Sequence, residues 1–305
     1  MKGKSASRRK DGFSISVLGS GTVGLNIGKG LQEIGNHVVF YDTDHEKLDH
    51  LLSLGLAATH DIRYAALNSQ ASFICVPTPT VSGKIDLSYL KSVVRRLAMS
   101  LREKKDYHLV VVKSTVLPST AESVVIPLLN RLSEKNVGDS IGLCCNPEFL
   151  TEIHNTWTNE RAYARSFFNE PFVVIGEYDK KSGDMLEAIY RPLRTHFIRT
   201  DLKTAEMIKY SFNCALACRI SYWNEIFQIC RRLGVDSNVV ASTAGMDERI
   251  GKYGTVHGKA FGGKCLPKDL QAFISMSERL GYEPELLRAV ERINTKIASE
   301  FGIRE

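Results

Sequence analysis

The sequence predicts an α/β protein with a doubly wound, Rossmann-like parallel sheet, followed by a long central helix and an all-helical region. Apolar runs of about five residues recur through the first half of the chain, separated by roughly 20–35 residues. A glycine-rich turn follows the first run, and the second half opens with a long stretch that lacks both Pro and Gly. Short strands that alternate with helices are typical of a parallel sheet covered on both faces.

The first strand is expected at residues 14–18, with a helix to about Ile34 after the glycine-rich turn. The run at 171–175 is expected to be the last strand of the sheet. Between them the apolar runs predict strands at residues 37–41, 71–76, 108–112 and 141–145.

Residues 201–233 form the stretch without Pro or Gly, with apolar residues at helical spacing. A helix of that length would extend about 50 Å, so we expect it to join two domains or to pack against its copy in a homodimer. Residues 236–305 predict further helices, interrupted by a glycine-rich loop at 251–263. We predict a disordered basic tail at 1–12, a dinucleotide-binding domain at 13–200 and a helical domain at 201–305.

Charge and composition exclude several classes of protein. The net charge is +6, but the basic tail contributes most of it, which argues against a nucleic-acid partner. No run approaches the roughly 18 apolar residues of a membrane span, so we expect no membrane partner. Seven cysteines without a Cys-x-x-Cys pair predict no metal site and favour a reducing cytoplasm.

A G-x-G-x-x-G motif formed by Gly19, Gly21 and Gly24 follows the first expected strand and opens a helix. Its glycines permit a tight turn, close approach of a pyrophosphate and helix–strand packing, and the helix start at Thr22 and Val23 offers backbone N–H groups to phosphate. Asp42 ends the second expected strand, where a carboxylate accepts hydrogen bonds from ribose hydroxyls and repels a 2′-phosphate. The sequence therefore favours NAD over NADP, and over a glycine turn that binds no nucleotide.

Polar residues gather in four segments where loops leave the sheet or face a cleft. Lys209 and Asn213 are four residues apart and share one face of the long helix. The other segments are Ser114 with Thr115, NPEFLTE at 146–152, and FGGKCLPKD at 261–269. Each segment alone also fits an exposed surface or a packed cysteine, but together they favour a site in which a lysine near Cys265 promotes the reactive thiolate.

Taken in their order along the chain, these segments resemble the UDP-glucose/GDP-mannose dehydrogenase family, and the resemblance covers nearly the whole chain. The resemblance includes Asp42 with Lys47 and the cysteine motif around Cys265. It continues through CVPTP at 75–79, DLSY at 86–89, KSTV at 113–116, AEMIK at 205–209, and DERIG at 247–251.

The resemblance implies that two NAD oxidise a sugar primary alcohol to a carboxylate. Cys265 would capture the aldehyde as a thiohemiacetal, which is oxidised to a thioester and hydrolysed. Lys209 and Asn213 would stabilise the oxyanion, and Thr115 and Glu152 would position water, with Glu152 as general base. Asp269 would orient the region of the thiol.

The resemblance also implies binding residues. The cofactor would be bound by the glycine turn, Asp42, Lys47, Thr78 and Thr115. The nucleotide-sugar substrate would contact Lys209 and Asn213, and also Glu148, Phe149, Leu150, Arg249, Tyr253, Phe261 and Gly262. Arg249 is expected to reach it across the dimer interface.

Members of this family usually carry a third, nucleotide-sugar-binding domain, whereas this sequence ends at Glu305. The chain is then a fragment, or a partner supplies the missing surface, or the substrate is not an ordinary nucleotide sugar. Two other functions stay open: a two-electron β-hydroxyacid-type dehydrogenase, which needs no thiol, and a non-catalytic NAD-binding partner of a complete dehydrogenase.

Overall fold

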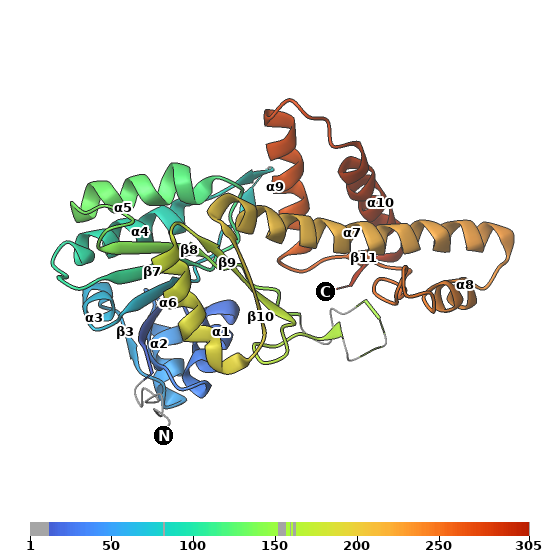
Figure 1. Ribbon diagram of the computed structural model, residues 1–305. Helices are drawn as coiled ribbons and strands as arrows, with labels where there is room; N and C mark the ends of the chain where they lie inside the picture. The colour runs from blue at the N-terminus through green and yellow to red at the C-terminus, as the bar shows by residue number, and fades with distance from the viewer. Residues whose placement is uncertain (1–11, 82, 152–156, 159, 161–162, 305) are drawn as a thin grey trace, which may run out of the picture.

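The computed structural model describes residues 12–81, 83–151, 157–158, 160 and 163–304 (Figure 1). Its centre is an eight-stranded sheet in the order β10-β9-β8-β7-β4-β1-β2-β3. The strands are β1 Ser14–Leu18, β2 His37–Tyr41, β3 Ala58–Thr59, β4 Ala71–Ile74, β7 His108–Val112, β8 Ile141–Cys145, β9 Phe172–Glu177 and β10 His196–Asp201. All neighbouring strands pair in parallel except β8 and β9, which are antiparallel.

Helices cover both faces of this sheet and bury a separate core on each. One face is covered by α1 Thr22–Glu33, α2 His45–Ser53 and α6 Lys180–Tyr190, whose apolar residues pack around Phe40, Phe73 and Ile175. The other face is covered by α3 Ile62–Leu67, α4 Ser88–Leu101, the π-helix η1 Ala121–Val125 and α5 Ile126–Ser133. A short 3₁₀ helix, η4 Arg191–Leu193, follows α6. The doubly wound architecture predicted from the apolar runs is confirmed.

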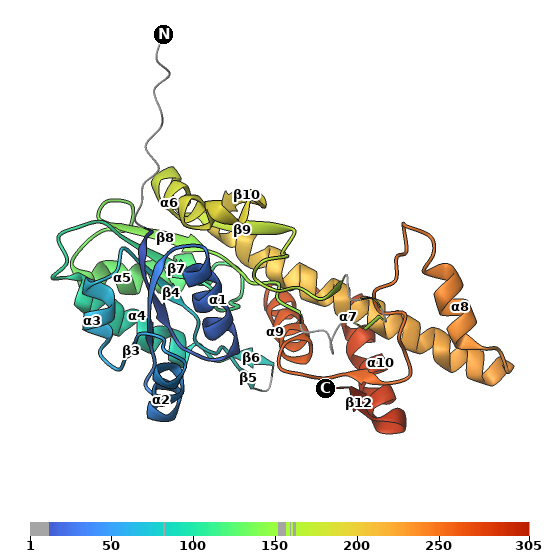
Figure 2. The same cartoon turned by 90° about the horizontal axis from the view of Figure 1, so that it is seen from below.

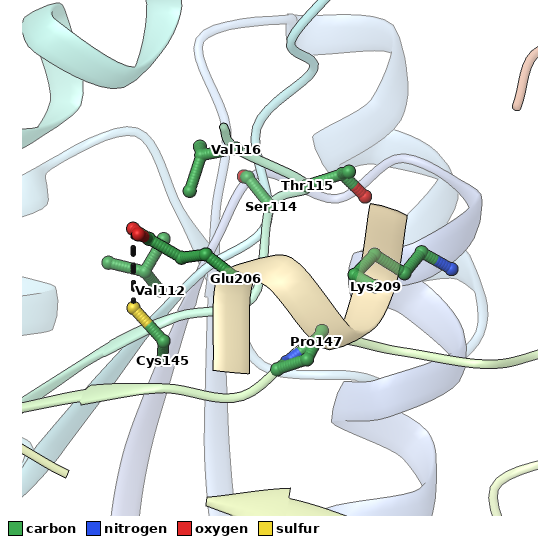
Figure 3. Close-up of a pocket in the computed structure, with 8 residues that line it drawn as sticks. All are labelled: Val112, Ser114, Thr115, Val116, Cys145, Pro147, Glu206 and Lys209. Atoms are coloured by element: carbon green, nitrogen blue, oxygen red, sulfur yellow. Dashed lines mark hydrogen bonds between the residues drawn. The ribbon is translucent and has the colours of Figure 1, made fainter. Parts of the chain in front are cut away.

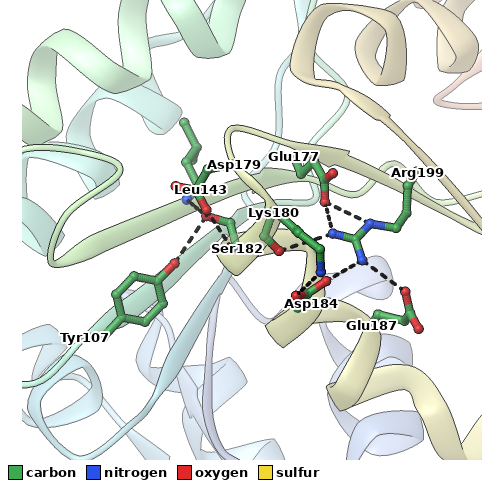
Figure 4. Close-up of polar contacts among 9 residues, drawn as sticks. All are labelled: Tyr107, Leu143, Glu177, Asp179, Lys180, Ser182, Asp184, Glu187 and Arg199. Atoms are coloured by element: carbon green, nitrogen blue, oxygen red, sulfur yellow. Dashed lines mark hydrogen bonds and ion pairs between the residues drawn. The ribbon is translucent and has the colours of Figure 1, made fainter.

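The expectation that the run at 171–175 closes the sheet is wrong, because β10 follows β9 as the edge strand. Its sequence, HFIRTD, is too polar to stand out as a buried strand. Charged side chains are common on edge strands because they discourage further pairing. Arg199 of β10 pairs with Glu177 of β9 and with Asp184 and Glu187 of α6, which ties the edge strand to its neighbours (Figure 4).

The predicted long helix is α7, Leu202–Leu233. It begins where the Asp201 side chain accepts a hydrogen bond from the Thr204 N–H, and it ends at Gly234, whose φ of 70° suits glycine. α7 runs from the sheet to the far end of the molecule, where α8 Ser237–Ala244 turns back beside it (Figures 1 and 2). Helices α9 Leu266–Arg279 and α10 Glu285–Phe301 pack along α7. The helical region also holds a short parallel pair, β11 Ala260–Phe261 and β12 Ile303–Arg304.

A small hairpin connects the sheet region to the helical region. Strands β5 Thr80–Val81 and β6 Lys84–Ile85 contact α9, and the Thr80 hydroxyl donates a 3.1 Å hydrogen bond to the Lys268 carbonyl. None of the helices in the described part of the chain has the length and hydropathy to cross a membrane. The predicted basic tail lies outside the described residues, apart from Gly12.

Candidate active site

The glycine turn between β1 and α1 leaves no room for side chains at two of its three glycines. Gly19 has a φ of 99°, and a Cβ there would lie 2.9 Å from the Cys75 carbonyl oxygen. A Cβ on Gly24 would lie 1.9 Å from the Gly19 carbonyl oxygen. At Gly21, by contrast, a Cβ would meet nothing within 4 Å, so this backbone faces open space beside the first turn of α1. That arrangement fits a diphosphate placed against the helix N-terminus.

Asp42 is held at the end of β2 as a buried carboxylate. Its Oδ2 accepts hydrogen bonds of 2.7 Å from both the N–H and the hydroxyl of Ser20, and its Oδ1 accepts one of 3.1 Å from the Asp44 N–H. Burial by itself would raise the pKa of Asp42, but these hydrogen bonds outweigh it and hold the pKa below its ordinary value. The residue is therefore an anion that can accept from a ribose hydroxyl.

The other residues expected at the cofactor site lie around this turn. Thr22 and Val23 form the first turn of α1, where no side chain caps the helix. Lys47 on α2 is half-exposed, and its Nζ lies 3.5 Å from Asp44 Oδ2. Thr78 is buried, and its hydroxyl donates a 2.6 Å hydrogen bond to the Thr115 carbonyl, so it joins the loops after β4 and β7.

Lys209 projects from α7 toward the loop that follows β8. Its Nζ donates a 2.5 Å hydrogen bond to the Glu148 carbonyl and lies 3.5 Å from Glu148 Oε1. Both residues are buried, and the amine also lies 5.2 Å from the centre of the Phe149 ring. α7 thus brings a cation to the carboxyl end of the sheet.

One turn later on α7, Asn213 reaches the helical region. Its amide Nδ2 donates a 2.6 Å hydrogen bond to Asp269 Oδ2, and Asp269 is almost completely buried. The other oxygen of Asp269 pairs with the ammonium of Lys268. Asp269 lies in the first turn of α9, and its N–H donates to the carbonyl of Cys265, the N-cap residue of that helix.

Cys265 is the exposed thiol among the cysteines of the described residues. Enough protein surrounds the sulfur that desolvation raises its pKa, and the positive charge of Lys209 is the main influence that lowers it. The Lys209 charge therefore acts on the Cys265 thiol, and the Asn213 amide is bonded to the helix that begins at this cysteine.

The remaining candidates lie in several different settings. Phe149 is buried, with its ring edge-on to Phe172 and Phe212, while Leu150 is half-buried and its N–H donates to Glu148 Oε2. Tyr253 and Phe261 are buried in the core around the middle of α7, and Gly262 packs against Ile303. Arg249 is exposed and pairs with Asp247 at 2.6 Å. Glu152, the expected general base, lies outside the described residues.

Comparisons with known proteins agree with this geometry. Residues 50–194 match the NAD binding domain of the UDP-glucose/GDP-mannose dehydrogenase family, and residues 203–296 match its central domain. The chain is 37% identical to a GDP-mannose 6-dehydrogenase of Pseudomonas aeruginosa, over 92% of this chain and 68% of that protein. It is 36% identical to the UDP-glucose 6-dehydrogenase AglM of Haloferax volcanii, over 92% of this chain and 69% of that protein.

The chain belongs to the UDP-glucose/GDP-mannose dehydrogenase family. A solved UDP-glucose dehydrogenase from Pyrobaculum islandicum superposes with a TM-score of 0.87 at 32% identity, and the match covers 95% of this chain and 70% of that one. Membership of this family makes the chain an NAD-dependent dehydrogenase. This confirms NAD as the cofactor, which the glycine turn and Asp42 predict.

Sequence reasoning missed a buried acid beside this dehydrogenase site. Glu206 lies three residues before Lys209 on α7 and lines a cavity of about 10 Å³ together with Thr115, Cys145 and Lys209. Its side chain turns toward Cys145 and away from the lysine (Figure 3). Oε1 accepts a 2.8 Å hydrogen bond from the Ala121 N–H, whereas Oε2 has no partner within the part of the chain that the structure describes. Burial raises the pKa of Glu206 to about 7.

Two further polar residues support the loop that follows β8. Lys113 is buried, and its Nζ donates to Asn146 Oδ1 at 2.9 Å; burial lowers the pKa of this lysine. Glu170 accepts a 3.0 Å hydrogen bond from the Phe149 N–H, and burial raises its pKa. Lys113 belongs to the KSTV segment at 113–116, and this motif is the sequence feature that pointed to the residue. In the described residues, no group of three His, Cys, Asp or Glu side chains could hold a metal ion.

Proposed function

We propose that this chain oxidises the primary alcohol of a nucleotide sugar to a carboxylate in two steps, with Cys265 holding the intermediate covalently. The observation that carries the proposal is the convergence of α7 and the start of α9. The Asn213 amide bonds Asp269, and the Lys209 charge acts on the exposed Cys265 thiol. A two-electron dehydrogenase needs no such thiol.

The first step removes a hydride from the alcohol carbon and a proton from its oxygen, giving an aldehyde. The Cys265 sulfur then bonds to the aldehyde carbon while the oxygen takes up a proton, giving a thiohemiacetal. Loss of a second hydride and a proton gives a thioester. Water attacks its carbon, the carbon–sulfur bond breaks, and the thiol is regenerated. NAD, when bound, accepts the hydride, so one alcohol and one water yield one carboxylate, two NADH and three protons.

The proposal gives each polar residue a part in this chemistry. Oxygen carries negative charge when sulfur or water adds to carbon, and the Lys209 ammonium and the Asn213 amide are the donors for it. Asp269 accepts from Asn213 and so orients that amide. Thr115 would hold the attacking water. The role of Glu152 as general base remains a prediction from the family resemblance.

The stoichiometry of NADH per substrate tests this proposal. Incubation with limiting GDP-mannose and with limiting UDP-glucose, the compounds named in the relatives, should yield two NADH per molecule oxidised. Cys265→Ser should abolish carboxylate formation, whereas Cys218→Ser, which changes a half-buried thiol on α7, should retain it. One NADH per substrate, unaffected by Cys265→Ser, would favour a two-electron β-hydroxyacid-type enzyme. NAD binding without turnover would favour a non-catalytic partner of a complete dehydrogenase.

We also propose that the chain forms a homodimer through α7. Tyr222, Ile229 and Leu233 lie on α7 at intervals of seven and four residues and are exposed, as are Val239 and Met246 around α8. Apolar residues at such spacing form one stripe along a helix, which suits a helix-to-helix contact. Light scattering should give a dimer mass, and Leu233→Glu should lower it toward a monomer. Leu54→Glu, at an exposed leucine just after α2, should leave the mass unchanged.

A further inference from the structure

A second pocket is lined by residues of α4, η1 and α5 and shares no lining residue with the cavity beside Lys209. Helices α4 and α5 lie side by side (Figure 1). Its volume is about 310 Å³, at the lower end of the range for small-molecule sites. Lys91 and Arg95 of α4 and Arg131 of α5 are the basic residues that line it. Pro127 and Leu128 of α5 add apolar surface to the lining.

The pocket is lined by three basic side chains and by no acidic one in the part of the chain that the structure describes. Among the described residues, none of Lys91, Arg95 and Arg131 forms an ion pair, and no acidic residue lines the pocket. Other basic residues of this region do form ion pairs, since Arg102 pairs with Glu134 and Lys203 pairs with Glu122. Three like charges around one concavity repel one another, and an anion placed between them would relieve that repulsion.

The wall contributed by η1 has unusual backbone geometry. Ser123 and Val124 of the pocket belong to this π-helix, a form that is rare and is often found at functional sites. It follows Ser119, a non-glycine residue with a φ of 73°. An irregular helix thus lies next to basic residues that have no ion-pair partner in the described part of the chain.

We propose that the pocket between α4 and α5 binds a phosphate-bearing small molecule, held by Lys91, Arg95 and Arg131. Two arginine side chains can each form paired hydrogen bonds to phosphate oxygens, and lysine adds a point charge. The apolar surface of Pro127 and Leu128 suits the body of a nucleotide or sugar phosphate. The pocket is concave and of small-molecule size, which favours such a ligand over a nucleic acid or a lipid surface.

Binding experiments on the full chain test this site. Titrations with inorganic pyrophosphate and with AMP are made in the presence of saturating NAD, so that the dinucleotide site is filled. Both probes should bind, with an affinity that falls as salt rises. The double variant Arg95→Gln/Arg131→Gln should weaken binding at least about tenfold, because both arginine contacts to the phosphate oxygens are lost.

A matched variant keeps the experiment specific. Arg279→Gln/Arg292→Gln removes the same charge from α9 and α10, where the described residues give neither arginine an ion pair, and it should bind both probes like the unmodified chain. Equal binding by the two double variants would overturn the proposal, as would loss of pyrophosphate binding when NAD is added. Binding confined to phosphatidylserine vesicles or to duplex RNA, with neither small probe bound, would also overturn it.

Discussion

The side-chain amide of Asn213 lies 2.6 Å from Asp269 Oδ2, across the contact between α7 and α9. The two residues are 56 positions apart in the sequence and both are buried. This hydrogen bond joins the helix that carries Lys209 to the helix whose N-cap is Cys265. The relative position of the proposed oxyanion donors and the proposed nucleophile therefore depends on it.

Asn213→Ala should weaken both the fold and the reaction. The variant leaves the buried Asp269 carboxylate with one donor fewer, which costs about 1–3 kcal/mol in the free energy of unfolding. NADH production should fall because an oxyanion donor is lost. Chemical denaturation and steady-state kinetics measure the two effects. Asn68→Ala, at an exposed asparagine after α3, is the control; wild-type stability and turnover in Asn213→Ala would contradict the arrangement.

Lys209→Met should make Cys265 less reactive. The lysine charge lowers the pKa of this thiol, so its removal raises the pKa and reduces the thiolate fraction at a given pH. Alkylation of Cys265 by iodoacetamide at pH 8, followed by mass spectrometry of its peptide, should slow severalfold. Lys203→Met removes an exposed charge six residues earlier on α7 and should leave the rate unchanged. An unaltered alkylation rate in Lys209→Met would show that the lysine charge does not act on the Cys265 thiol.

Gly21→Ala and Gly24→Ala should impair different properties, NAD binding and stability respectively. A methyl group at Gly21 meets nothing within 4 Å, so the variant should fold normally but bind NAD more weakly, because the methyl group occupies the approach of the diphosphate. A methyl group at Gly24 would lie 1.9 Å from a backbone oxygen and should lower the melting temperature. Thermal unfolding and NAD titration measure the pair. Undiminished NAD binding by Gly21→Ala would place the dinucleotide elsewhere.

Glu206→Gln should stabilise the protein at alkaline pH. The pKa of about 7 in the folded chain exceeds that of an unfolded glutamate, so the fold binds the proton more tightly. Stability is therefore lost as the pH rises from about 4.5 to about 7, by up to about 3 kcal/mol. The neutral amide removes this penalty.

Urea unfolding at pH 5 and pH 8.5 tests this expectation for Glu206. The variant should exceed the unmodified chain in stability at pH 8.5 and differ little from it at pH 5. Glu248→Gln, at an exposed acid, should show no such pH-dependent difference. A destabilised Glu206→Gln at pH 8.5 would mean that the ionised carboxylate is favoured in the fold.

The apolar runs and the glycine turn predicted the sheet, the long helix and the NAD site because these features depend on local pattern. Strand β10 was missed because an edge strand need not be apolar. The division into domains near residue 200 and the individual catalytic roles stay predictions.

By itself, the sequence determined the fold class, the family and the chemical types of side chain available, since each follows from residue identity and short-range spacing. Only the tertiary structure decided which of those side chains meet. Three such contacts join residues far apart in the chain. They are the bond of Lys209 to Glu148, the bond of Asn213 to Asp269, and the bond that Glu206 accepts from the Ala121 N–H. Such contacts depend on how helices pack against a sheet, and no local periodicity encodes that geometry.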